Sequence, residues 1–158
     1  MPFISLTRLR IRSIRFMPLF VLHTWRSMRQ IKRAPGFQTG ALLPDRSFTF
    51  WTMTAWDSED SMRQFMLSGS HKAAMPHLIQ WCDEASVAHW THPDPAHPSE
   101  PALPSKPALH SPPVLPSWQE ADRRMRSSGR PSKIKYPSPN HATLNYRAPR
   151  ITPGAKIT

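Results

Sequence analysis

Hydrophobic and polar positions alternate clearly in two segments of the chain, and both predict β-strands. In residues 3–11, Ile4 and Leu6 fall on one face, and the opposite face carries Phe3, Ser5, Thr7 and Leu9. Arg8 is expected to continue the first face toward solvent. Residues 48–56 carry the strongest strand pattern, since aromatic and β-branched residues favour a pleated surface. In this segment the even positions share a face: Phe48, Phe50, Thr52, Thr54 and Trp56.

A helix is predicted from Pro18 to about Arg33, because proline costs nothing in a first helical turn. Its inward stripe is expected to be Val21, Trp25 and Met28, which are spaced four and three residues apart. The basic residues of the same helix are expected to face solvent: Arg26, Arg29 and Arg33. Residues 34–36 then stop the helix.

A second helix is predicted after a cap at Asp57 or Ser58, because acidic residues follow in its first turn. Residues 68–70, Ser-Gly-Ser, are expected to interrupt this helix, which restarts near Pro76. Its buried stripe is expected to consist of Met62, Phe65 and Met66. Two further strands are expected, at 37–43 and 85–91.

The predicted order is β-α-β-β-α-β over residues 1–91, a ferredoxin-like α+β domain. It has a four-stranded antiparallel sheet with two helices on one face. The other face is left open, and its exposed aromatic surface predicts a homodimer formed through it. The aromatic residues assigned to that face are Phe48, Phe50 and Trp56.

Prolines divide the rest of the chain, since 14 of the 19 follow residue 91. Residues 92–116 are interpreted as a flexible spacer, because from 95 to 107 proline recurs at every third position, the period of polyproline II. Residues 117–129 carry a capping box at Ser117 to Glu120 and a terminal Gly129, which predict a short helix. Residues 130–158 show no period and are expected to form a basic coil.

The formal charge of +11 permits contact with nucleic acid or an anionic surface without requiring either. Cys82 is the single cysteine, so an internal disulfide is impossible and a cytoplasmic location fits best. The apolar run at 16–25 is about ten residues long, too short to cross a membrane. No membrane span is expected.

His71 is the candidate general base, because it lies at the helix break where a pocket could open, and neutral imidazole accepts protons near pH 7. A histidine that only caps the second helical piece is the alternative. The histidines and Cys82 between positions 71 and 92 match no compact metal-ligand spacing, so no metal is expected. A nucleotide cofactor is not expected either, because the five glycines form no phosphate-binding loop.

Three segments of residues 1–91 resemble the dimeric α+β-barrel superfamily. They are 34–37 (Ala-Pro-Gly-Phe), the strand at 48–56, and the helix that opens with Trp-Asp-Ser-Glu-Asp and reaches Ser-Gly-Ser-His at 68–71. This superfamily includes the antibiotic-biosynthesis-type and haem-degrading monooxygenases and, more distantly, spheroidene monooxygenase. The capped helix at 116–121 resembles the terminal helix of uncharacterised bacterial members.

The resemblance implies a homodimer and a pocket between sheet and helices, in which an apolar aromatic substrate activates oxygen without a cofactor. Haem-degrading members carry a tryptophan and a histidine ligand where this chain has Phe65 and Met75, which argues against haem degradation. The residues expected to contact the substrate are Ser5, Phe50, Thr52, Trp56, Phe65 and His89. Of these, Phe50 and Trp56 would shape the wall, while Ser5 or Thr52 would offer a hydroxyl.

Two alternatives remain. The same strand order builds the RNA-recognition motif, whose third strand stacks bases on aromatic residues. Residues 46–53 match that motif at Arg46, Phe48 and Phe50 but not at its small positions. The second alternative is a small-molecule-binding protein without catalytic activity.

Overall fold

The computed structural model describes residues 1–92, 114–152 and 155–157. Most of the predicted spacer therefore lies outside the described residues. The elements follow one another as β1 (Phe3–Ile11), a 3-10 turn (Ile14–Phe16), α1 (Met17–Ile31), β2 (Phe37–Asp45), β3 (Thr49–Trp56), α2 (Glu59–Met66), α3 (Gly69–Trp81), β4 (Cys82–Thr91), α4 (Trp118–Ser128), β5 (Arg130–Pro131) and β6 (Ala155–Ile157).

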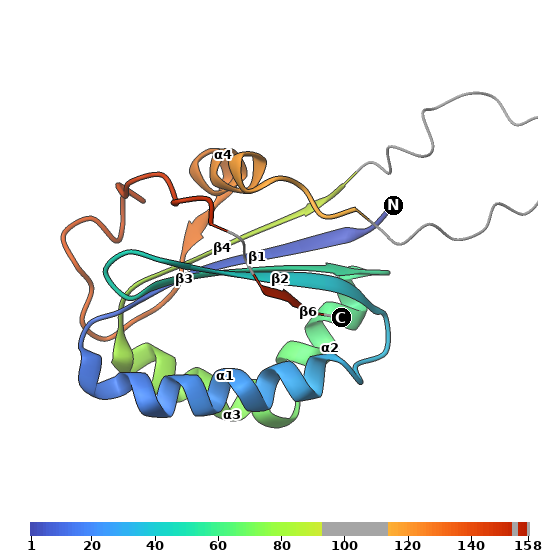
Figure 1. Cartoon of the computed structure of the whole chain (residues 1–158), viewed down its shortest axis with the longest axis horizontal. Helices are drawn as coiled ribbons and strands as arrows, with labels where there is room; N and C mark the ends of the chain where they lie inside the picture. The colour runs from blue at the N-terminus through green and yellow to red at the C-terminus, as the bar shows by residue number, and fades with distance from the viewer. Residues whose placement is uncertain (93–113, 153–154, 158) are drawn as a thin grey trace, which may run out of the picture.

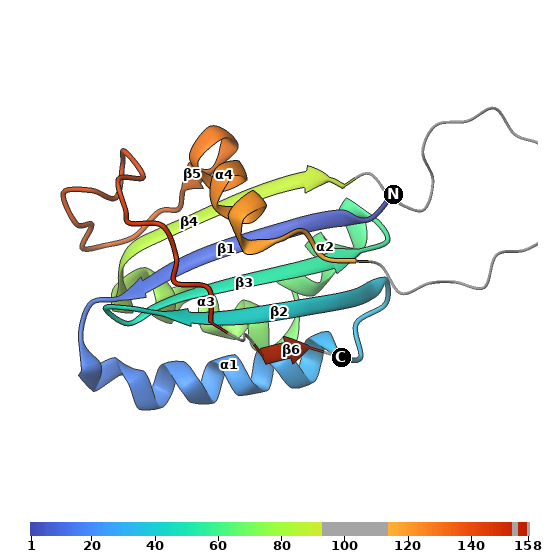
Figure 2. The ribbon, with the colours of Figure 1, turned by 45° about the horizontal axis from the view of Figure 1, so that its top comes forward.

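The sheet has the order β5-β4-β1-β3-β2-β6, and every strand pair is antiparallel (Figure 2). Its four long strands confirm the predicted ferredoxin-like α+β fold. The short strands β5 and β6 extend its two edges, so the expectation of coil throughout 130–158 is wrong. Strands of two and three residues are too short to leave a periodic signal in the sequence.

α1 and α3 cover one face of the sheet, as Figure 1 shows. Phe20 and Ile31 are the buried residues of α1, whereas Val21 is 56% exposed and Trp25 is 52% exposed. The predicted inward stripe is therefore wrong at Val21 and Trp25. The predicted stripe and the observed one, which contains Phe20 and Ile31, both have helical spacing. Only the packing partners decide which of the two is buried.

The second helical region also differs from the expectation. Ser58 caps α2 by accepting the Ser61 N–H at 3.2 Å, as predicted. However, α3 begins at Gly69 and contains Pro76, so the predicted restart near Pro76 is wrong. Pro76 is exposed and lies in the middle of α3, where proline normally disrupts helical hydrogen bonding.

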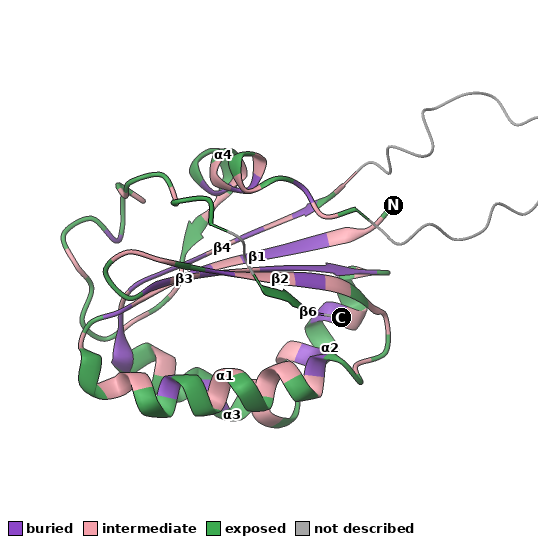
Figure 3. Ribbon diagram, viewed as in Figure 1, coloured by how far each residue is buried: buried purple, intermediate pink, exposed green. Residues whose placement is uncertain are grey.

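The opposite face of the sheet is covered by the chain's own C-terminal segment, residues 114–152 (Figure 1). Ser117 caps α4 as predicted, by accepting the Glu120 N–H at 3.2 Å. Ala121 and Met125 of α4 are fully buried and pack against the sheet. Figure 3 shows buried positions on α4. Their apolar partners on the strands include Ile4, Leu6, Trp51, Met53 and Trp90.

The aromatic residues assigned to the open face lie elsewhere. Phe50 and Trp56 point toward the helices, where Phe50 packs on Phe20 and Trp56 packs on Phe65. The odd positions of β3, among them Trp51, meet α4 instead. The assignment failed because both faces of β3 are strongly apolar, so its sequence carries no sign of which face meets the helices.

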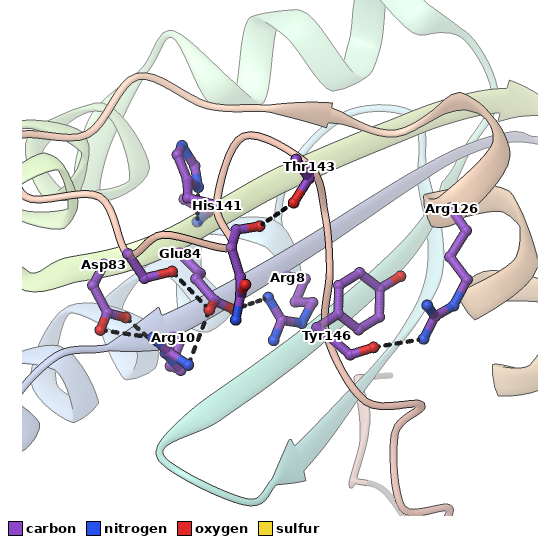
Figure 4. A network of polar contacts seen from close by, with 11 residues as sticks. Arg8, Arg10, Asp83, Glu84, Arg126, His141, Thr143 and Tyr146 are labelled. Atoms are coloured by element: carbon purple, nitrogen blue, oxygen red, sulfur yellow. Dashed lines mark hydrogen bonds and ion pairs between the residues drawn. The ribbon is translucent and has the colours of Figure 1, made fainter.

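A buried polar network fastens the C-terminal segment to the strands (Figure 4). Arg8 donates to Glu84 across 2.7 Å, and Ser138 donates to the other Glu84 oxygen at 2.9 Å. The Arg8 guanidinium also lies 4.2 Å from the centre of the Tyr146 ring. Arg8 was expected in solvent and is buried. The sequence could not reveal its partners, which are distant along the chain.

The homodimer was predicted to form through the face that residues 114–152 cover. Dimerisation there would require this segment to leave, exposing Trp51, Met53 and their neighbours. The homodimer therefore stays a prediction, and it needs another surface if the segment remains in place.

Met125→Asp tests the packing of α4. A carboxylate at this buried position should lower the free energy of unfolding by about 3 kcal/mol, because an unpaired charge is costly inside protein. Gln119→Asp places the same charge on the exposed side of α4 and should change stability by less than about 0.5 kcal/mol. Urea denaturation of the full chain measures both. Equal stabilities would contradict packing of α4 on the sheet.

Candidate functional site

The space between the sheet and the helices is packed by two separate apolar clusters. One cluster surrounds Phe20 and Trp81 and includes Phe50. The other surrounds Trp56 and Phe65 and includes Ile31. Because the two clusters do not merge, the helix-facing side of the sheet has a middle section that belongs to neither cluster.

Side chains with hydroxyl groups occupy this middle section. Ser5 on β1 pairs with Thr54 on β3, and Thr7 pairs with Thr52. The line from Phe20 to Ile31 along α1 passes Thr24 and Ser27, at helical spacing. We call this set the hydroxyl section: Ser5, Thr7, Thr24, Ser27, Thr52 and Thr54.

The helices do not fully cover the hydroxyl section. Thr52, Thr7 and Val87 form one row across β3, β1 and β4, and all three are only half-buried. On the opposite face, the central residues Leu6 and Met53 are 0% and 2% exposed. Solvent therefore reaches the middle of the sheet from the helix side alone, which makes this side the place where a ligand could meet the strands.

An aromatic row bounds one end of the section. The ring centres of Trp56 and Phe65 lie 5.3 Å apart, and those of Phe65 and His71 lie 4.8 Å apart. The Trp56 indole N–H donates to the Thr54 hydroxyl at 2.9 Å, so the row joins the hydroxyl section directly. This end offers flat apolar surface together with one titratable group.

The surroundings of His71 fix the tautomer of its imidazole ring. Its Nδ1 lies 3.2 Å from the carbonyl oxygen of Met66, which can only accept, so Nδ1 carries the proton. The neutral ring therefore keeps its lone pair on Nε2. Burial lowers the pKa of His71 from its ordinary value of 6.5, and the bond to Met66 opposes this shift. His71 is thus neutral near pH 7 and able to accept a proton.

Gln30 of α1 positions the helix that carries His71. Its side-chain oxygen accepts the His71 backbone N–H at 2.9 Å, and its nitrogen donates to the Ser68 carbonyl at 3.0 Å. Gly69 adopts a φ of +52°, and a Cβ there would lie 2.9 Å from the Gln30 amide. Glycine at this position therefore lets Gln30 cap the start of α3.

The predicted site residues are brought together only in part. Ser5 and Thr52 lie in the hydroxyl section, next to the row of Trp56, Phe65 and His71. Phe50 lies at the far end, with its ring centre 4.8 Å from that of Phe20.

His89 flanks the section on β4, opposite Ser5 and 5.8 Å from the Phe3 ring centre. Burial lowers its pKa, helped by the charge of Arg130.

The sequence interpretation missed Thr7, Thr24, Ser27 and Gln30. Thr7 could have been found, because it alternates with Ser5 along β1. Thr24 and Ser27 have helical spacing from Phe20, but the wrong stripe of α1 was chosen. Gln30 acts through α3, so no local pattern points to it.

Two properties of the described residues bear on function. No three His, Cys, Asp or Glu side chains among them gather as a group able to hold a metal ion. None of their helices has both the length and the apolar character needed to span a membrane.

Comparisons with known proteins give a fold and no sequence family. No protein-family model matches the chain, and no curated protein matches it. Several solved structures share its fold. Protein Rv0793 from Mycobacterium tuberculosis superimposes with a TM-score of 0.54 at 12% identity, covering 61% of this chain and all of that one.

Two further structures carry functional descriptions. A proposed antibiotic biosynthesis monooxygenase from Nitrosomonas europaea gives a TM-score of 0.51 at 12% identity, over 60% of this chain and 92% of its own. A variant of SnoaB, a cofactor-independent oxygenase from Streptomyces nogalater, gives a TM-score of 0.50 at 16% identity. The match covers 58% of this chain and 92% of the SnoaB chain. The chain therefore has the fold of the antibiotic-biosynthesis-monooxygenase-like proteins, as its sequence predicted. At these identities the likeness shows the fold alone.

We predict that His71 titrates below pH 6.5 in the folded protein. Because folding lowers its pKa, its contribution to stability is complete above 6.5 and is lost as pH falls through the folded value. The imidazole resonances followed by NMR give the midpoint, and His71→Gln assigns them. The variant should also lose less stability than the wild type between pH 6.5 and about 5. A midpoint at or above 6.5 would contradict the buried neutral ring.

Proposed function

We propose that this protein is a monooxygenase-type enzyme that needs no cofactor and binds a flat, apolar aromatic molecule in the hydroxyl section. The observation that carries the proposal is the continuous row of Trp56, Phe65 and His71 beside partly accessible hydroxyl groups. Sharing a fold with a cofactor-independent oxygenase agrees with the proposal.

The two parts of the site suit the two parts of such a substrate. Trp56 and Phe65 offer ring faces and edges for stacking. Among the described residues, the side chains of Thr7 and Thr52 make no hydrogen bond, so their hydroxyls are free to donate to a phenolic or quinone oxygen. Thr54 already accepts from Trp56 and therefore supports the wall.

The proposed reaction starts with proton removal. His71 Nε2 takes the proton of a quinol hydroxyl, and the resulting anion is electron-rich enough to reduce oxygen. One oxygen atom enters the ring and the other leaves as water, so quinol plus O₂ gives hydroxyquinone plus water. The substrate supplies both electrons that reduce the second oxygen atom, and no external reductant is needed. The role of His71 is to act as the general base.

The RNA-binding alternative is less well supported. An RNA-recognition motif stacks bases on aromatic residues of its open sheet face. Here Phe50 packs against Phe20 of α1, and residues 114–152 cover the opposite face. A small-molecule-binding protein without turnover remains the second candidate, because the same aromatic row and hydroxyl groups would serve it.

The predicted cytoplasmic location also stays a proposal. It is supported by Cys82, which is fully buried and whose pKa burial raises to about 12. A thiol in this state is unreactive and needs no disulfide partner.

Oxygen uptake with fused-ring quinols tests the function. We expect the purified full chain to consume O₂ in the presence of a chelator, and His71→Gln to lower the rate about 100-fold, the usual contribution of a general base. His77→Gln removes an exposed imidazole of the same helix and should leave the rate unchanged. Product mass should show the gain of one oxygen atom and the loss of two hydrogen atoms, the composition of the hydroxyquinone.

Three outcomes separate the candidates. Unchanged turnover in His71→Gln would remove His71 from the mechanism. Quinol binding without oxygen uptake would favour the small-molecule-binding alternative. Tight RNA binding that weakens steeply with salt, with no turnover, would favour the RNA-binding class.

A further inference from the structure

A hollow lies on the exposed side of the helix layer and reaches the aromatic row at Phe65. It is a groove of about 800 Å³ between the C-terminal half of α1 and the junction of α2 with α3. Its size falls in the range of small-molecule sites. We call it the basic groove and define it by the lining residues that matter for binding: Trp25, Arg26, Arg29, Arg33, Gln64 and Phe65.

The basic groove carries uncompensated positive charge. Arg26, Arg29 and Arg33 line it, and none of its lining residues is acidic. Within the described residues no carboxylate forms an ion pair with any of the three, whereas Arg8, Arg10 and Arg63 are all paired. Three guanidinium groups facing one hollow favour an anionic occupant.

The groove also offers aromatic surface. Trp25 is half exposed, and the Arg29 guanidinium lies 4.9 Å from its ring centre. Phe65 closes the inner wall, and its ring is the one that contacts Trp56. An exposed indole beside cationic groups is suited to stack on a flat ring that bears a negative charge.

The floor of the groove is fixed before any ligand arrives. Gln30 and Ser68 both line it, and the Gln30 side chain joins α1 to Ser68 and to the start of α3. Arg33 lies in the turn that follows α1, and from Arg26 to the end of α1 at Ile31 the rise is roughly 7.5 Å, at 1.5 Å per residue. This length matches two or three fused rings better than a run of nucleotides.

We propose that the basic groove binds a flat aromatic molecule that carries a carboxylate, sulfonate or phosphate group. Arg29 and its neighbours hold the acidic group, while Trp25 stacks on the ring. The two sites share Phe65, but the groups that hold the ligand here, Trp25 and Arg29, lie outside the proposed oxygenase site, and the proposal does not depend on that function.

Calorimetric titration of the full chain with 2-naphthoate tests this site. Naphthoate should bind once per chain and about tenfold more tightly than neutral 2-naphthamide, because charge-assisted hydrogen bonds are the stronger ones. Arg29→Gln should remove that preference. Lys32→Gln removes one charge from the adjoining turn without touching the groove, and affinity should stay within about twofold.

Trp25→Leu distinguishes stacking from charge. It should weaken naphthoate and naphthamide alike, and circular dichroism checks that each variant is folded. Equal affinity for the two probes, or equal losses in Arg29→Gln and Lys32→Gln, would overturn the proposal. Binding of a single-stranded RNA oligomer that naphthoate does not displace would replace it with a nucleic-acid surface. Failure of the oxygen-uptake assay would leave these results unaffected.

Discussion

The whole structure depends on a sheet whose two faces are both too apolar to meet water. Along β3, the even positions include Phe50 and Trp56, and the odd positions include Trp51 and Met53. Side chains of successive residues point to opposite faces, so a single helix layer can bury only half of them. Residues 114–152 supply the second layer, and α4 is its main element. The polar contacts of Glu84 with Arg8 and Ser138 fix that layer in position.

The two layers bury the sheet to different degrees, and this difference creates the candidate site. On the α4 side, the central residues of the strands are completely enclosed. On the other side, the apolar contacts gather at the two ends of the helices, and threonine and serine remain between them. A sheet that is firmly packed from behind can hold a partly open face without losing its shape. His71 enters this arrangement through Gln30, which fixes the start of α3.

The sequence predicted those features that depend on local patterns. Alternation in residues 3–11 and 48–56 located the central strands, and Ser58 and Ser117 were recognised as helix caps. The orientation of β3 was missed because both of its faces are apolar. The inward side of α1 was missed because the apolar positions that start at Phe20 and those that start at Val21 both have helical spacing. The burial of Arg8 depends on partners more than 70 residues away.

In the candidate site, too, the residues that belong to local patterns were predicted and those that depend on packing were missed. His71, Phe65 and Trp56 were predicted because they flank a visible helix break and a clear strand. Phe50 was placed with them because it shares a face with Trp56, yet the two residues lie in different apolar clusters. Thr24 and Gln30 depend on how α1 is rotated, which its sequence does not determine.

An NMR titration of the ¹⁵N-labelled full chain with a fused-ring quinol, performed without oxygen, tests most directly whether the hydroxyl section is the binding site. We expect the largest amide shifts at Thr7, Thr52 and His71, on the side of the sheet that faces the helices. Shifts centred on Met125 and Trp51, or no shifts at all, would contradict a ligand site between the sheet and the helices.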